Sequence, residues 1–139
     1  MKLESSASLA AAGLALGRLL LAALFILEGW SKLRGYEAAV AYMDRHGVPG
    51  LLLPAAIALE LGGGAMIAVG WQTRIAAVAL AAFSILAAIL FHGNISERSH
   101  LLHLEKDLAI AGGLLVLAVA GPGRLALAKG AADQAVKGR

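Results

Sequence analysis

Long apolar stretches constrain this chain more than any other feature of its sequence. Three of them, at residues 7–27, 51–69 and 75–91, contain at most one charged side chain each. A helix needs about 20 predominantly apolar residues to cross the hydrocarbon core of a bilayer. Hydrophobic residues make up 60% of the chain, against roughly 45–50% in soluble domains. The chain therefore has too little polar surface to cover such helices in water, and we predict that they span a membrane.

A fourth apolar run, residues 108–120, reaches spanning length if its helix begins near Leu101. The predicted fold is all-α, an integral membrane four-helix bundle with up-down-up-down topology. We expect one domain over residues 1–139, with spans at approximately 7–29, 49–70, 73–92 and 101–121. The first span is expected to be retained, because its apolar run contains Arg18, which is foreign to the apolar region of a signal peptide.

The segment between the first two spans has the pattern of a short amphipathic helix. Its apolar positions recur at i, i+3, i+4 and i+7, in Tyr36, Ala39, Val40 and Met43. The main interpretation is an interfacial helix that rests on the lipid headgroups and ends at Gly47 and Pro49. The alternative is a lid over the bundle.

Two charged residues inside the spans carry most of the functional information. Counted from Leu27 and Leu51 at the shared loop, Arg18 and Glu60 each lie nine residues deep, which is about 13–14 Å along a helix. Unpaired charges are costly at this depth, so we predict that the two residues form an ion pair. One interpretation is that the pair has a purely structural role and fixes the register of two helices. The other is that the pair lines a ligand cavity.

Gly63 and Gly64 lie three and four residues after Glu60, on the same helical face. They remove side-chain volume beside the carboxylate. Either a neighbouring backbone fills that space, as small residues allow in membranes, or a ligand does. The sequence leaves both interpretations open.

Further polar residues gather at the ends of the spans on one side of the predicted bundle. We expect Glu28, Lys32, His92 and Lys106 to form the polar mouth of a cavity above Arg18 and Glu60. His100 and His103 are also near, but histidines at the ends of membrane helices are usually interfacial hydrogen bonders, so no metal site is predicted.

Composition excludes other classes of function. The chain has no cysteine, which removes disulfides, thiolate metal sites and cysteine nucleophiles. Its net charge of +3 comes from basic residues scattered among helix ends, so we predict contact with lipid headgroups and not with nucleic acid. The distribution of basic residues slightly favours cytoplasmic termini.

Four motifs are the most distinctive parts of the chain, namely "GRLLLAALFILEGWSKLRGYE", "ALELGGGAMIAVGWQTR", "FHGN" and "EKDLAIAGG". Through them the sequence resembles the DoxX family of small four-helix bacterial inner-membrane proteins over most of its length. The most specific positions are Arg18, Gly29, Lys32, Glu60, Gly70, Arg74, His92 and Lys106. Some family relatives resemble membrane subunits of thiosulfate:quinone oxidoreductase, and others act with superoxide dismutase and a thiol oxidoreductase in antioxidant complexes. Related eukaryotic proteins resemble cargo receptors of the secretory pathway.

The resemblance favours a quinone-associated membrane subunit that works with redox partner proteins at the bacterial inner membrane, and it does not fix whether the chain itself is an enzyme. On this hypothesis Arg18 and Glu60 line the cavity, and Glu60 or His92 carries protons, because quinone reduction consumes protons at a buried site. The alternative is a non-catalytic scaffold or small-solute binder or transporter. With either function, the protein can form a homo-oligomer.

Overall fold

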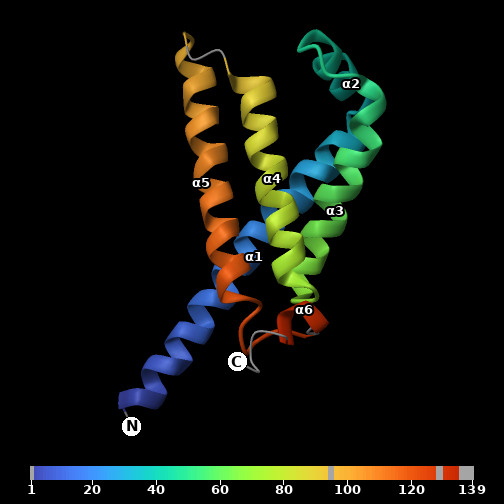
Figure 1. The fold of residues 1–139 in the computed structure, drawn as a ribbon. Helices are drawn as coiled ribbons and strands as arrows, with labels where there is room; N and C mark the ends of the chain where they lie inside the picture. Colours follow the sequence, from blue (N-terminus) through green and yellow to red (C-terminus); the bar gives the residue numbers. More distant parts are fainter. Residues whose placement is uncertain (1, 94–95, 128–129, 135–139) are drawn as a thin grey trace.

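The computed structural model describes residues 2–93, 96–127 and 130–134, and every regular element in these ranges is helical (Figure 1). The elements follow one another in the order α1 Lys2–Arg34, α2 Tyr36–Arg45, a short 3₁₀ turn Gly50–Leu52, α3 Leu53–Val69, α4 Thr73–His92, α5 Arg98–Ala120 and α6 Ala131–Gln134.

Three helical stretches of the described residues are long and apolar enough to cross a membrane, namely Glu4–Arg34, Gly50–Val69 and Thr73–His92. They correspond to the first three predicted spans. The fourth predicted span falls on α5, which is 23 residues long. Because α5 begins with a polar stretch that includes Glu105, Lys106 and Asp107, it is not among these three. The four-span bundle therefore stays a prediction.

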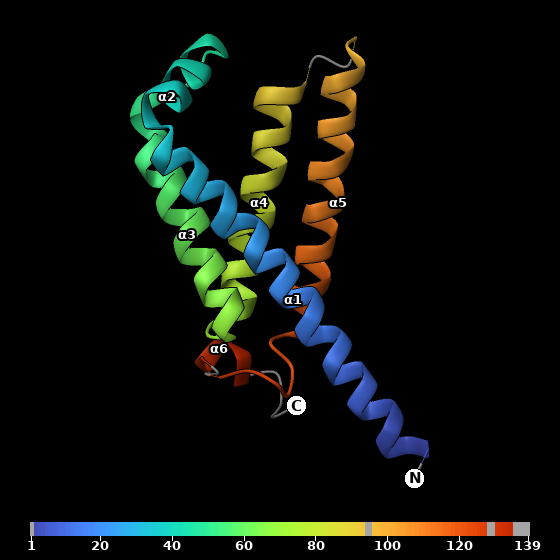
Figure 2. The same cartoon turned by 180° about the vertical axis from the view of Figure 1, so that it is seen from behind.

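The long helices are arranged in two pairs. α1 packs along α3, α4 packs along α5, and the pairs meet chiefly through α3 and α4. The pairs lie close together at the end that carries α6 and separate toward the end that carries α2 (Figures 1 and 2). A buried apolar cluster holds the pairs together, with Phe25 from α1, Ile67 from α3, Leu80 from α4 and Leu114 from α5 among its members. α1 also projects past the other helices at its N-terminal end (Figure 2).

Small residues allow α3 to approach its neighbours closely. A Cβ atom on Gly63 would lie 3.0 Å from a side-chain carbon of Leu80, and one on Gly64 would lie 3.2 Å from the backbone oxygen of Ala22. Neighbouring helices therefore occupy the space beside both glycines. Of the two interpretations of these glycines, the structure agrees with close helix packing and not with a ligand beside them.

Helix α2 folds over the end of the bundle. Met43 is buried with Val48 and with Leu53 of α3 in a second apolar cluster. Tyr42 of α2 also contacts Phe91 of α4, with ring centroids 5.5 Å apart. The amphipathic helix thus contacts both helix pairs at the end where they separate, and its interfacial position stays a prediction.

Charged residues close the opposite end, which we call the closed polar end and define by Arg18, Arg74 and Asp133. Both arginines donate hydrogen bonds to backbone oxygens at the end of α5 or just beyond it. Arg18 reaches Pro122 O at 3.0 Å and Leu125 O at 2.8 Å, and Arg74 reaches Ala118 O at 2.7 Å. Ala118 belongs to the last turn of α5, whose carbonyls have no partner within the helix. Pro122 and Leu125 lie beyond the end of that helix.

Asp133 completes the closed polar end from α6. Its carboxylate accepts hydrogen bonds from the backbone N–H groups of Thr73 at 3.1 Å and of Arg74 at 3.2 Å, at the start of α4. It also accepts one from Gly130 N at 3.2 Å. A carboxylate at this position satisfies free N–H groups and is favoured by the helix dipole. Asp133 therefore caps α4 from a distant part of the chain.

Candidate functional site

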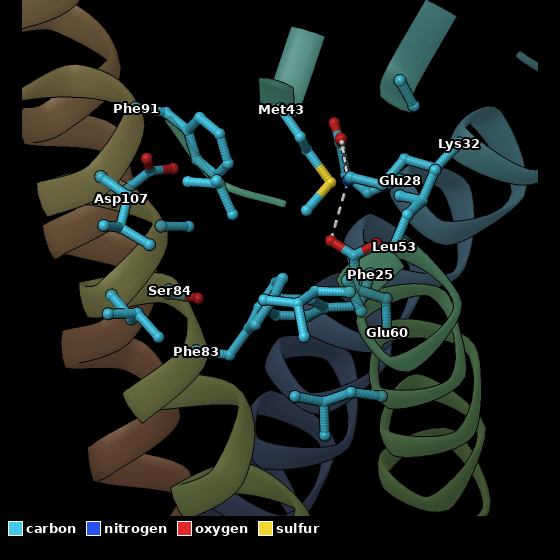
Figure 3. Close-up of a pocket in the computed structure, with 18 of the residues that line it drawn as sticks. Phe25, Glu28, Lys32, Met43, Leu53, Glu60, Phe83, Ser84, Phe91 and Asp107 are labelled. Atoms are coloured by element: carbon cyan, nitrogen blue, oxygen red, sulfur yellow. Dashed lines mark hydrogen bonds and ion pairs between the residues drawn. The ribbon is translucent and has the colours of Figure 1, made fainter. Parts of the chain in front are cut away.

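A cavity of about 560 Å³ lies between the two helix pairs, under α2 (Figure 3). Its lining is mainly apolar, and Phe25, Phe83, Phe91 and Tyr42 contribute aromatic rings. Ligand sites are typically apolar cavities of about 300–1,000 Å³ with a few polar groups that orient the ligand. This cavity has both the size and the composition of such a site.

The wall formed by α1 and α3 carries a partly buried ion pair. Lys32 Nζ of α1 lies 2.9 Å from Glu60 Oε1 of α3 and 3.3 Å from Glu28 Oε2 (Figure 3). Glu60 is only 3% exposed, whereas the side chain of Lys32 is 29% exposed. Gly29 lets the two helices meet here, because a Cβ atom on it would lie 3.1 Å from the Cβ of Glu60.

One atom of this ion pair is incompletely bonded. Glu60 Oε2 is buried and has no hydrogen-bond partner among the described residues. Buried polar atoms are normally hydrogen-bonded, so an exception marks a position that needs an explanation. The exception here belongs to a side chain that lines the cavity.

Histidines and an acidic residue make up the second polar wall. His92 Nε2 at the end of α4 lies 3.7 Å from Asp107 Oδ2 of α5. The His92 ring stacks on that of His103, with centroids 5.0 Å apart. Lys106 lines the same side of the cavity. The second wall therefore faces the Lys32–Glu60 pair across the apolar space.

The predicted ion pair between Arg18 and Glu60 is wrong. Arg18 donates to the carbonyls of Pro122 and Leu125 at the closed polar end, and Glu60 binds Lys32 at the cavity. The cause is the length of α1, which continues to Arg34 instead of ending near residue 27. The α1–α3 register is consequently displaced by about ten residues from the one we assumed, or roughly 15 Å.

The structure separates the predicted site residues into two groups. Glu60 and the four predicted mouth residues, Glu28, Lys32, His92 and Lys106, all line the cavity. Arg18, Gly63 and Gly64 are not among its lining residues, because they pack against the chain elsewhere.

The predicted site residues omit several groups that the structure places at the cavity. Asp107 belongs to the polar stretch that the sequence places at the same end of the bundle, but its contact with His92 depends on how α4 packs against α5. Phe25, Phe83 and Ser84 line the cavity within continuous apolar runs, where no periodic signal marks the inward face.

Comparison with known proteins identifies the family. The DoxX family profile matches residues 13–93, which is more than half of the chain and includes Lys32, Glu60 and His92. The chain belongs to the DoxX family. This DoxX protein is 46% identical over 111 residues to inner membrane protein YqjF of Escherichia coli (strain K12), covering 80% of this chain and 85% of that protein.

A second relative of this DoxX protein is inner membrane protein YphA of Escherichia coli (strain K12). The two are 30% identical over 122 residues, covering 82% of this chain and 86% of that protein. No solved structure matches. With three apolar helices of spanning length and inner-membrane relatives, this DoxX protein is a multi-pass inner-membrane protein.

Proposed function

We propose that this DoxX protein is the quinone-binding membrane subunit of a redox complex, with the ligand held in the cavity between the two helix pairs. One observation carries the proposal: an apolar cavity of about 560 Å³ has an ion pair, Lys32–Glu60, on one wall and His92 with Asp107 on the other. A quinone has an apolar ring and tail and two polar oxygens, which suit these surroundings.

The residues of the cavity have distinct roles in this proposal. Phe25 and Phe83 pack against the ring, since flat aromatic surfaces stack favourably. Lys32 donates a hydrogen bond to a ligand oxygen. His92 exchanges protons between the ligand and the outer part of the cavity end, where the ring of His103 stacks on that of His92. Electrons come from a partner protein, because the chain has no cysteine to carry them.

We also propose that residues 1–139 form one membrane domain with four spans. α5 forms the fourth span, and Lys106 and Asp107 of its charged first turns line the cavity, as is usual for charged groups in membrane helices. With four spans both termini lie on one side, which we assign to the cytoplasm from the distribution of basic residues.

A pair of matched variants on α4 tests ligand binding. Ala87 lines the cavity, whereas Ala82 on the same helix is exposed. We expect short-chain quinones to bind the purified protein in calorimetric titrations. Ala87→Phe fills the cavity and is expected to weaken binding at least about tenfold, and Ala82→Phe is expected to leave it unchanged. Absence of quinone binding by the wild-type protein would refute the proposal.

The second candidate function is a non-catalytic small-solute binder or scaffold. The lack of cysteine favours it, because no residue of the chain can form a thiol redox centre. Purification in mild detergent separates the two functions. A bound partner with quinone-reducing activity supports the redox subunit, and a homo-oligomer that binds no quinone supports the scaffold.

A further inference from the structure

We propose that the polar position beside Lys32 and Glu60 takes a hydroxyl group in preference to a carbonyl group. The cavity then binds a hydroquinone, or another phenol of similar size, more tightly than the corresponding quinone. This inference rests on the proposed function, and it names which form of the ligand the cavity favours.

The acceptor for the hydroxyl is Glu60 Oε2. Oε1 is occupied by Lys32 Nζ at 2.9 Å, while Oε2 is buried without a partner among the described residues. An ionised carboxylate can only accept hydrogen bonds, so a ligand satisfies Oε2 only if it supplies a donor. The terminal torsion of a glutamate is broad, and rotation about the Cγ–Cδ bond moves both oxygens together, so Oε2 meets the ligand when the whole carboxylate turns and the Lys32 ammonium follows Oε1.

The donor at the same position is Lys32. An ammonium group has three N–H donors, and here two of them face Glu60 and Glu28. Lys32 lines the cavity and its side chain is 29% exposed, which leaves the third donor for a ligand oxygen.

A hydroxyl group matches this donor–acceptor pair, because its oxygen accepts from Lys32 while its hydrogen is donated to Glu60. A carbonyl oxygen accepts from Lys32 but leaves Glu60 Oε2 without a partner. Sites with a buried polar group discriminate strongly against a ligand that leaves that group unpaired.

The second wall does not oppose this preference. His92 Nδ1 is also buried without a partner among the described residues. A neutral imidazole nitrogen can donate or accept according to its tautomer, so His92 suits the second oxygen of either ligand form. Glu60 is therefore the residue that distinguishes the hydroquinone from the quinone.

Three ligands of the same ring and tail test the inference in anaerobic titrations of the full-length protein: a short-chain hydroquinone, its quinone and its dimethyl ether. We expect the hydroquinone to bind about tenfold or more tightly than the other two. The quinone matches the hydroquinone in size but lacks its O–H donors, and the dimethyl ether keeps the aromatic ring while methyl groups replace both donors, so this comparison needs no variant.

Glu60→Gln is expected to abolish most of the preference, and Glu105→Gln, which changes an exposed carboxylate outside the cavity, is expected to retain it. Equal binding of all three ligands, tighter binding of the quinone, or a preference that survives Glu60→Gln would overturn the inference while leaving quinone binding intact. If none of the three ligands binds, the proposed function fails as well.

Discussion

The two ends of the helix bundle both hold charged side chains, but these bind different kinds of partner. At the closed polar end, Arg18, Arg74 and Asp133 bind backbone groups that the turns of the chain leave free. At the cavity end, Lys32 and Glu60 bind each other, and both side chains line the cavity. Both ends hold buried polar atoms without a partner among the described residues, Arg18 Nε and Arg74 Nε at one end and Glu60 Oε2 at the other. Burial of a charge in this protein therefore does not by itself indicate function, and our assignment of a structural role to one end and of the proposed ligand site to the other rests on the cavity.

The largest expected effect comes from breaking the closed polar end at Arg18. Arg18→Gln removes donors from two carbonyls, at a cost of about 1–3 kcal/mol for each one left unpaired in a buried site. Thermal unfolding in detergent measures the loss. Arg34→Gln, an exposed change on the same helix, is the control and is expected to stay within about 0.5 kcal/mol of wild type. An Arg18→Gln variant as stable as the control would contradict the structural role.

A double-mutant cycle on Lys32 and Glu60 sharpens the comparison at the cavity end. Lys32→Met and Glu60→Leu each leave a charge without its partner, so the double variant is expected to be more stable than the sum of the single effects implies. We expect a coupling of about 1–3 kcal/mol, reduced by the partial exposure of Lys32. The same cycle on Arg18 and Glu60 is expected to be additive, because these residues have separate partners. Coupling in the second cycle and not in the first would reverse our assignment.

The smallest effect is expected at Asp133. Asp133→Ala removes the acceptor for the first N–H groups of α4, and loss of such a cap costs about 0.5–2 kcal/mol. Asp133→Asn keeps one side-chain oxygen and is expected to lose less. Unfolding of both variants in detergent gives the order. Quinone affinity is expected to be retained in both, since the cap lies at the end of the bundle away from the cavity.

Much of the fold could be predicted because long apolar runs are a strong signal. The boundaries of α4 were predicted at 73–92 and lie at Thr73–His92. The length of α1 was predicted less well, because its last turns carry polar residues that resemble a loop. Those turns hold Glu28 and Lys32, which are polar because they face the cavity.

The sequence predicted most of the polar residues that line the candidate site, but it did not predict which of them form ion pairs. The polar ends of several spans indicated Lys32, His92 and Lys106 as neighbours, since topology brings those ends together. The partner of Glu60 depended on the helix register, and a shift of a few residues changes which side chains meet. Asp133 could not be predicted at all, because its contact with α4 joins segments about 60 residues apart and no local pattern marks it.

The separation of the two helix pairs has a thermodynamic consequence. The cavity walls come from helix pairs that lie close together at the far end of the bundle, and α2 joins them at the cavity end through Tyr42 and Phe91. A molecule that binds between the walls adds contacts to both of them. By mass action, a ligand at a concentration 100 times its Kd adds about 2.7 kcal/mol to the stability of the folded state. We therefore expect a ligand of the proposed site to join the two helix pairs and to raise the unfolding temperature of the protein as its concentration rises.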